Sequence, residues 1–202
     1  MCGRFENKSS PEYIAELLIQ QDLEAEIIGT KGKGPNYNIA PTNKIIGVIK
    51  NEKKHSVRYF NWGIKFSSDS PLIFNSRIET IKEKKFWWSL FDKNRTIIPM
   101  TGFYEWKKES GRKIPYKIFL PGNKTFFVPA IYFNKKETSE PFASLITTTP
   151  NKFIKKIHHR MPVIFDELND ALKFLNQDAK EIVEMCKPFD GEKEMELERA
   201  SI

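Results

Sequence analysis

The sequence predicts a single α+β domain built on a mostly antiparallel sheet with flanking helices. The main observation is that residues 95–148 hold short β-branched and aromatic runs separated by Gly, Pro, Asn and Lys. Such runs predict strands joined by hairpins, and helical spacing of apolar residues near both ends supplies the α part. The 202 residues are 40% hydrophobic and 13% aromatic. That composition suffices for one folded core, so we assign residues 1–202 to one domain.

The first helix is predicted from its start signal. Ser9 or Ser10 precedes Pro11, and both residue types favour the first turn of a helix. Ile14 and Leu18 then give an apolar face at helical spacing. The other elements are expected as a loop at 29–43, strands at 45–49 and 57–62, a helix at 79–91, and helices at 150–157 and 167–186.

The end of the chain differs in charge from the rest. The formal net charge is +7, but residues 178–202 hold eight acids and four bases. We therefore expect residues 187–202 to form an acidic tail that is on the surface or frayed. The remaining body is strongly basic, which favours polyanions such as nucleic acid. A lysine-rich surface with no such partner explains the charge equally well.

Several classes of protein are disfavoured by what the sequence lacks. It has no apolar run long enough to span a membrane and no apolar signal-peptide core. We expect a cytosolic monomer, nucleoid-associated if the chain is bacterial. The cysteines are Cys2 and Cys186, with no CxxC or HExxH pattern, so we expect neither a metal site nor a cofactor. Cys186 is expected to be a buried apolar thiol.

Cys2 is the residue with the most distinctive chemistry. Removal of Met1 would leave an α-amine beside the thiol, and the amine has a reference pKa of about 7.7 to 8.0. An aldehyde can form a Schiff base with that amine, and the thiol can then close a thiazolidine ring. By position alone, the alternative that Cys2 is an ordinary residue is favoured.

Three further segments hold candidate catalytic groups. In an extended FNSRIET segment, Asn75 and Arg77 would share a face, suited to a carbonyl and a phosphate. Glu105 lies among aromatics in TGFYEW, where desolvation would raise its pKa and suit proton transfer. In IHHRMP, His158 could act as acid or base, and Arg160 could bind a phosphate or orient Glu105. The alternatives are a polar loop, a strand facing water and a basic helix end.

Taken in order, these segments closely resemble the SOS-response-associated peptidase (SRAP) family, the abasic-site shielding proteins. The resemblance runs from Met1 to about Ile164. The ordered blocks are MCGRF, YNIAPT (37–42), NWGI (61–64), FNSRIET (74–80), RTIIPMTGFYEW (95–106), PYKI (115–118), LITTTPN (145–151) and IHHRMPVI (157–164).

The resemblance implies a fold and an activity. Family members have a barrel-like, strand-rich core and a basic groove for single-stranded DNA. They remove their own Met1, and the exposed cysteine bonds to the ring-opened sugar of an abasic site in a thiazolidine crosslink. The implied class is an autoproteolytic peptidase with crosslinking or lyase-type activity in the DNA damage response. Its partner is single-stranded DNA with abasic sites, and any replication-fork partners are not identified.

The resemblance also implies roles for individual residues. Cys2 matches the nucleophile, Asn75 the group that positions the sugar or amine, and Glu105 the catalytic acid. His158 matches the acid or base of ring opening and crosslink reversal. The residues implied in DNA binding are Arg4, Pro41, Trp62, Arg77 and Arg160. Pro41 and Trp62 would offer flat surfaces to bases, whereas Trp106 is expected in the core.

The sequence departs from the family pattern in three places. His159 stands where an acidic residue is common, so either histidine could carry the acid-base role. Met100 and Thr101 replace the usual Ala-Asp before Gly102. The family's C-terminal strand pattern is not evident after Pro188.

Two other functions are compatible with parts of the sequence. One is a cysteine peptidase that acts on other proteins through Cys2 and His158. It would need an oxyanion hole and a peptide cleft that the sequence does not display. The other is a non-catalytic module that binds single-stranded DNA through lysines and tryptophans. A Cys2→Ala variant separates the three.

Overall fold

The fold centres on a closed ring of strands. The chain was analysed as a computed structural model, which describes residues 2–29, 35–52, 54–135, 138–191 and 194–202. The ring runs in the order β5 (Lys54–Trp62), β4 (Lys44–Asn51), β7 (Arg95–Met100), β10 (Phe126–Phe133) and β11 (Phe142–Thr148). These neighbours are antiparallel, and a parallel pairing of β11 with β5 closes the ring. The α+β class and the barrel-like antiparallel core are confirmed.

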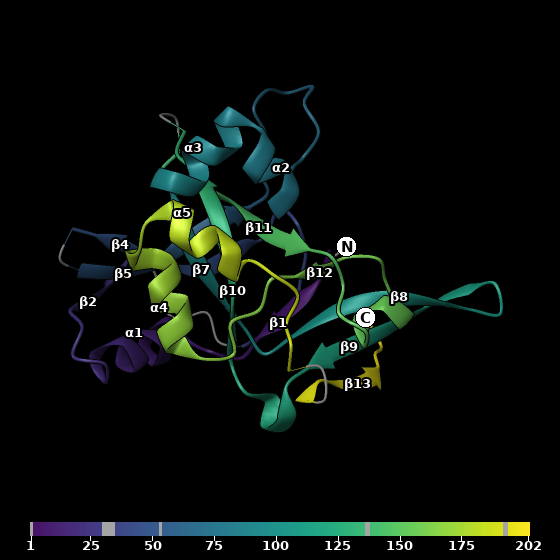
Figure 1. Cartoon of the computed structure of the whole chain (residues 1–202). Coiled ribbons are helices and arrows are strands. Elements are labelled where there is room, and N and C mark those ends of the chain that lie inside the picture. The colour runs from purple at the N-terminus through teal and green to yellow at the C-terminus, as the bar shows by residue number, and fades with distance from the viewer. Residues whose placement is uncertain (1, 30–34, 53, 136–137, 192–193) are drawn as a thin grey trace.

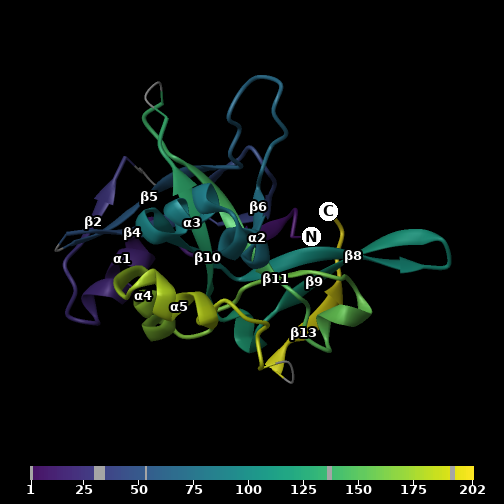
Figure 2. The ribbon, with the colours of Figure 1, turned by 45° about the horizontal axis from the view of Figure 1, so that its top comes forward.

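A second sheet lies beside the barrel and carries the N-terminal residues. Its order is β13 (Glu196–Arg199), β9 (Arg112–Phe119), β8 (Gly102–Glu109), β1 (Phe5–Asn7) and β3 (Asn36–Ile39). Both views show β8 and β9 as a hairpin that extends away from the rest of the molecule (Figures 1 and 2). The sheet therefore joins a buried base, at β1, to an exposed ribbon.

Helices cover the outside of the barrel (Figure 1). They are α1 (Pro11–Ile19), α2 (Ile78–Glu83), α3 (Lys85–Lys93), α4 (Leu168–Asn176) and α5 (Ala179–Ile182). Alternation along the strands sends one set of apolar side chains outward to these helices, as with Val48, and the other inward, as with Ile49. The inner set is continuous with Phe5 and Phe103 of the second sheet, and Cys2 belongs to this cluster.

Short strands on β11 bring in two further segments. β6 (Asn75–Arg77) pairs with β11 in parallel, and β12 (Met161–Pro162) pairs with it antiparallel. Lateral pairing on a shared strand thus places the FNSRIET and IHHRMP segments near each other. On the other side of β5, the short strand β2 (Ala25–Ile28) pairs with it in parallel and contacts α1.

Local signals for α1 are confirmed. Ser10 is the N-cap, and its hydroxyl accepts from the Tyr13 backbone N–H at 3.1 Å. Pro11 occupies the first turn, where its missing N–H costs nothing. Ile14 and Leu18 are buried against the barrel. The strands predicted at 45–49 and 57–62 also exist, as parts of β4 and β5.

The single helix predicted at 79–91 is wrong, because the chain breaks at Lys84 into α2 and α3. Lys84 has an extended backbone with ψ of 116°. On one continuous helix, Ile81 and Leu90 would point in very different directions. The break lets α2 bury Ile81 and α3 bury Leu90 and Phe91 in the same core.

Three other boundaries also need correction. The helix expected at 150–157 is a 3₁₀ turn, η2 (Ile154–Lys156), and the one at 167–186 divides into α4, α5 and the 3₁₀ turn η3 (Val183–Met185). Asp178 causes that division, since its carboxylate accepts from the Lys180 N–H and starts a new helix. The loop expected at 29–43 contains β3, while residues 30–34 lie outside the described part.

The tail expected at 187–202 to be on the surface or frayed is on the surface at β13, but among the described residues after Pro188 it is anchored and not frayed. Phe189 and Met195 are buried in the inner core, and β13 pairs with β9 along four residues. The β13 side chains are all exposed, so no apolar alternation marked the strand. A charged edge strand held by backbone hydrogen bonds is a common way to avoid edge-to-edge association. Cys186 is a buried thiol, as predicted.

Candidate functional site

Cys2 lies at the buried base of the second sheet. The next residues run antiparallel to β8, where the Tyr104 N–H donates to the Arg4 carbonyl at 2.9 Å. In this chain, which still carries Met1 in its sequence, the Cys2 side chain is 0% exposed. Burial raises the pKa of its thiol, and the nearby Glu105 carboxylate raises it further. The thiol is therefore protonated at neutral pH, and it donates a weak hydrogen bond to the Arg4 carbonyl, 3.8 Å away.

Asn75 approaches Cys2 from the barrel. Its neighbour Ser76 points inward, where its hydroxyl contacts Ser144 at 2.8 Å, so Asn75 and Arg77 share the opposite face. The Asn75 Nδ2 donates to the Cys2 carbonyl at 2.9 Å. Its Oδ1 is buried and has no hydrogen-bond partner among the described residues. Asn75 therefore orients the Cys2 backbone and leaves an acceptor beside it.

Glu105 and His158 face each other across the site. Glu105, on β8, is 2% exposed, and its Oε1 lies 3.9 Å from the His158 Nδ1. Burial raises the pKa of Glu105 and lowers that of His158 to about 4. At neutral pH the imidazole is thus uncharged, and the carboxyl titrates closer to neutrality than an exposed one. This is the separation of environments that acid-base chemistry requires.

The Arg160 backbone holds the His158 ring in place. Its N–H lies 3.1 Å from the His158 Nδ1 and its carbonyl oxygen lies 3.2 Å from the same atom. Nδ1 can accept from the first group or donate to the second, according to the tautomer. His159 stacks on this ring with centroids 4.3 Å apart and is exposed. Of the two histidines, His158 is the one that faces Glu105.

The predicted DNA-binding residues are placed very differently from one another. Arg77 is exposed at the end of β6, and Arg4 is half-buried and donates to the Asn38 side chain. Pro41 is partly exposed in the turn between β3 and β4. These three remain compatible with a DNA surface around the site.

The structure corrects the expectation for Trp62. Its side chain is 0% exposed, and its indole N–H donates to the Phe74 carbonyl at 2.9 Å. Phe5 and Phe74 pack edge-on against its ring. No face of Trp62 is open to a base, so it is a core residue that supports the Cys2 and Asn75 segments.

Arg160 also has a different task from the one expected. Its guanidinium binds both Glu79 carboxylate oxygens, at 2.8 and 2.9 Å, and the Thr147 carbonyl at 2.8 Å. The fork is therefore occupied by Glu79 of α2 and is directed neither at a phosphate nor at Glu105. No sequence pattern indicates this pairing, because β11 brings the two segments together: it pairs with β12, which follows Arg160, and with β6, which precedes α2.

A hollow of about 550 Å³ opens beside the acid-base pair. It is lined by Glu105, Trp106, Lys113 and His158. Trp106 is half-buried here, so its expected core position is wrong. The hairpin leaves the body just past Glu105, and that change of surroundings exposes one side of the indole. Lys113 was not singled out from the sequence, because an exposed lysine in a polar hairpin has no distinguishing signal.

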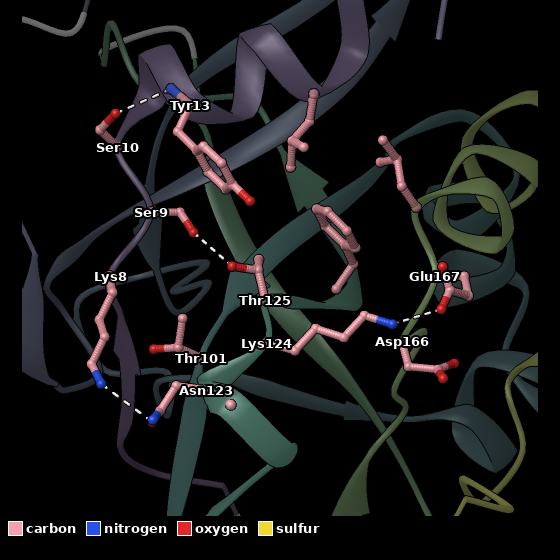
Figure 3. A pocket seen from close by; sticks show the side chains of 14 residues that line it. Lys8, Ser9, Ser10, Tyr13, Thr101, Asn123, Lys124, Thr125, Asp166 and Glu167 are labelled. Atoms are coloured by element: carbon pink, nitrogen blue, oxygen red, sulfur yellow. Dashed lines mark hydrogen bonds and ion pairs between the residues drawn. The ribbon is translucent and has the colours of Figure 1, made fainter. Parts of the chain in front are cut away.

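A larger hollow, of about 680 Å³, lies away from this chemistry. It is bounded by the start of α1, the turn at Asn123 and the segment before α4 (Figure 3). Its lysines already have partners: Lys8 donates to Asn123 at 3.2 Å, and Lys124 donates to Glu167 at 2.6 Å. Cys2, Asn75, Glu105 and His158 are not part of its lining. We assign the chemistry to the smaller hollow.

The described residues hold neither a candidate metal cluster nor a helix that could span a membrane. Across the described ranges, no cluster of three or more His, Cys, Asp or Glu side chains could hold a metal ion. Within the same part of the chain, the helices are too short or too polar to cross a membrane. Both thiols are free.

The barrel brings a buried cysteine at position 2 together with an amide, a carboxyl and a histidine. The sequence pattern of the SOS response associated peptidase (SRAP) family matches residues 1–201, and the chain belongs to that family. This confirms the resemblance carried by the ordered motifs.

Relatives and solved structures agree with that assignment. Abasic site processing protein YoaM of Bacillus subtilis is 32% identical, covering 95% of this chain and 88% of the relative. Abasic site processing protein YedK of Escherichia coli is 28% identical over 81% of this chain and 75% of its own length. A crystal structure of a Bacteroides thetaiotaomicron protein superposes with a TM-score of 0.79 at 26% identity, covering 99% of this chain and 92% of that one.

Proposed function

We propose that this protein processes abasic sites in single-stranded DNA by bonding covalently to them through Cys2. The family assignment and the names of the relatives support abasic-site processing as the class of activity. The observation that carries the chemistry is the meeting of Cys2, Asn75, Glu105 and His158 from four separate segments. Only tertiary structure brings these groups together, and each can take part in capture of an aldehyde.

The proposed reaction begins with removal of Met1, by hydrolysis of the bond before Cys2. The freed α-amine attacks the aldehyde of a ring-opened abasic sugar, and water leaves as the imine forms. The Cys2 sulfur then adds to the imine carbon, and its proton passes to the former imine nitrogen by way of a base. The product is a thiazolidine, and the net balance is aldehyde plus aminothiol giving ring plus water.

The site's protonation states suit this order of events. The Cys2 thiol is protonated because burial raises its pKa, so the amine attacks first and the sulfur needs a base. Glu105 is close enough to Cys2 to affect its titration, and because burial raises its own pKa, it keeps a proton to higher pH than an exposed carboxyl does. Asn75 holds the Cys2 carbonyl, which fixes the direction of the neighbouring amine.

The two alternatives fit the geometry less well. A cysteine peptidase acting on other proteins needs a thiolate with a lowered pKa, whereas the pKa of the Cys2 thiol is raised. A non-catalytic DNA-binding module has no use for a desolvated Glu105 facing His158. Both alternatives also leave the position of cysteine directly after Met1 unexplained.

Intact-mass analysis of the untagged protein with abasic single-stranded DNA tests the proposal. The expected product is the chain without Met1 plus the DNA minus one water. Cys2→Ser should give only an imine, which is detected as a stable amine after borohydride reduction. Cys2→Ala should still bind the DNA but form no stable adduct. Cys186→Ser is the matched control, because Cys186 is buried elsewhere, and it should react normally.

Two outcomes would contradict the proposal. One is an adduct of unchanged yield on Cys2→Ala. The other is a wild-type adduct that still contains Met1. Salt gives a further check, since initial capture should weaken with ionic strength while the finished adduct resists it.

A further inference from the structure

The β8–β9 hairpin extends beyond the hollow that Glu105, Trp106, Lys113 and His158 line. In its register, Trp106 lies opposite Pro115, Lys108 opposite Lys113, and Glu109 opposite Arg112. The ribbon projects from the body in both views (Figures 1 and 2). Both faces of the ribbon therefore extend outward from the site, and the register assigns each charged side chain to one of them.

One face of the ribbon is closed by internal contacts. Glu109 accepts from the Lys107 ammonium at 2.9 Å and from the Tyr116 hydroxyl at 3.0 Å. Arg199 of β13 donates to the same carboxylate at 3.0 Å. Alternation places Lys107, Glu109, Arg112 and Tyr116 together on this face, which Glu105 shares closer to the body of the protein. Its cations thus surround an acid that belongs to the protein.

The other face is built differently. Alternation places Trp106 and Lys108 of β8 with Lys113 and Pro115 of β9, so two lysines lie directly across from each other. Like charges in a directly opposed cross-strand pair repel and destabilise the hairpin. Neither Lys108 nor Lys113 has a salt bridge to any acid in the described ranges. Lys113 also lines the hollow beside Glu105 and His158.

We propose that Lys108 and Lys113 bind the backbone phosphates of the DNA strand where it leaves the hollow. An anion between the two ammonium groups would relieve their repulsion, and the Trp106 indole beside them offers a surface on which a base can stack. Lys108 lies two residues beyond Trp106, roughly 7 Å further along the ribbon. The hairpin thus extends the DNA path on one side of the lesion. This inference rests on the proposed function, because it assumes DNA in the hollow.

Equilibrium binding as a function of salt tests the inference. Each full-length variant carries Cys2→Ala, so that no thiazolidine can form and binding stays reversible. The slope of log affinity against log salt should become shallower by about 1.4 in Lys108→Gln/Lys113→Gln, from roughly 0.7 per phosphate on a single strand. The loss of affinity should therefore be larger at low salt than at high salt. Lys107→Gln/Arg112→Gln removes the same charge from the other face of the same ribbon and should change the slope by less than half as much.

Strand length locates the contact. When the single strand is trimmed nucleotide by nucleotide on either side of the abasic site, wild type should lose affinity sharply on one side only. The Lys108→Gln/Lys113→Gln variant should not respond to that trimming. Its thermal midpoint should not fall, because a repulsive pair has been removed, so weaker binding would not reflect unfolding. Equal slopes for both double variants, or equal length dependence, would overturn the inference.

Two readouts separate this inference from the proposed function. With Cys2 intact, the adduct yield at saturating DNA should be the same in Lys108→Gln/Lys113→Gln as in wild type. If wild type itself forms no adduct, the proposed function fails, while the salt comparison still reports on the lysines. Inorganic phosphate should compete no better than sulfate of equal ionic strength. Stronger competition would assign the lysines to a free phosphate and overturn the DNA assignment.

Discussion

Two buried glutamates on neighbouring strands show how one residue type is used in two ways. Glu6 of β1 and Glu105 of β8 are each 2% exposed. Glu6 accepts from the Lys117 ammonium at 3.0 Å and from the Thr101 hydroxyl at 3.0 Å. Glu105 instead faces an imidazole that is neutral at pH 7. Glu6 is buried with a cation and is a structural group, whereas burial is the main influence on Glu105 and raises its pKa.

The surroundings of Glu6 explain its structural role. Lys117 also reaches Glu198 of β13 at 3.3 Å, so it ties the N-terminal strand to the C-terminal one. A side chain at Gly102 would lie 2.9 Å from the Lys117 Cε, so glycine leaves room for the ammonium to pass. Thr101, one of the departures from the family pattern, supplies a hydrogen bond here. This network positions β1, which follows Cys2 directly.

The largest effect is expected at Glu105. Glu105→Gln should slow adduct formation by about 10²–10⁴-fold, the usual contribution of a positioned acid or base. Its stability should rise slightly at pH 7. The pKa of Glu105 is higher in the folded protein than in the unfolded chain, so ionising this carboxyl at high pH costs the wild type stability. The stability gained by Glu105→Gln should therefore shrink below about pH 4.5, where the carboxyl is protonated in both states. Single-turnover kinetics and thermal melts measure both, and a variant that reacts normally would refute the assigned role.

Glu6→Gln should have the opposite profile. Removing one partner of a buried ion pair costs about 3 kcal/mol, because the Lys117 ammonium remains desolvated. The remaining ion pair of Lys117 with Glu198 offsets part of this loss. Denaturant unfolding measures this loss. The double variant Glu6→Leu/Lys117→Met replaces the pair with apolar groups and should recover much of the stability. If Glu6→Gln reduced the reaction rate at saturating DNA as strongly as Glu105→Gln, the contrast between the two carboxylates would be wrong.

A smaller effect concerns pH and His158. Its folded-state pKa is about 4, against about 6.5 when unfolded, so the unfolded chain binds more protons between these values. Stability should therefore fall as pH drops from 6.5 towards 4, with a slope that approaches one proton. His158→Gln should remove that part of the slope, whereas His159→Gln, at an exposed ring, should leave it. Identical slopes in wild type and His158→Gln would show that His158 is charged in the folded protein.

Much of the fold could be predicted because its signals are local. Ser10 and Pro11 start α1 through their own capping geometry, and β4 and β5 follow β-branched runs. The break at Lys84 could not be predicted in this way, because it depends on which faces of α2 and α3 the barrel covers. β13 was missed for a related reason, because backbone pairing with β9 and not the pattern of its own side chains makes this segment a strand.

By itself, the sequence determined the reactive atoms: an amine and thiol at Cys2 once Met1 is removed, a carboxyl at Glu105 and an imidazole at His158. These are covalent properties that folding does not alter. Tertiary structure decided which of the charged and aromatic side chains are available to DNA. It buried Trp62, committed Arg160 to Glu79 and set Lys108 opposite Lys113. Burial and charge pairing depend on residues that are distant in the chain, so the local sequence around each side chain cannot specify them.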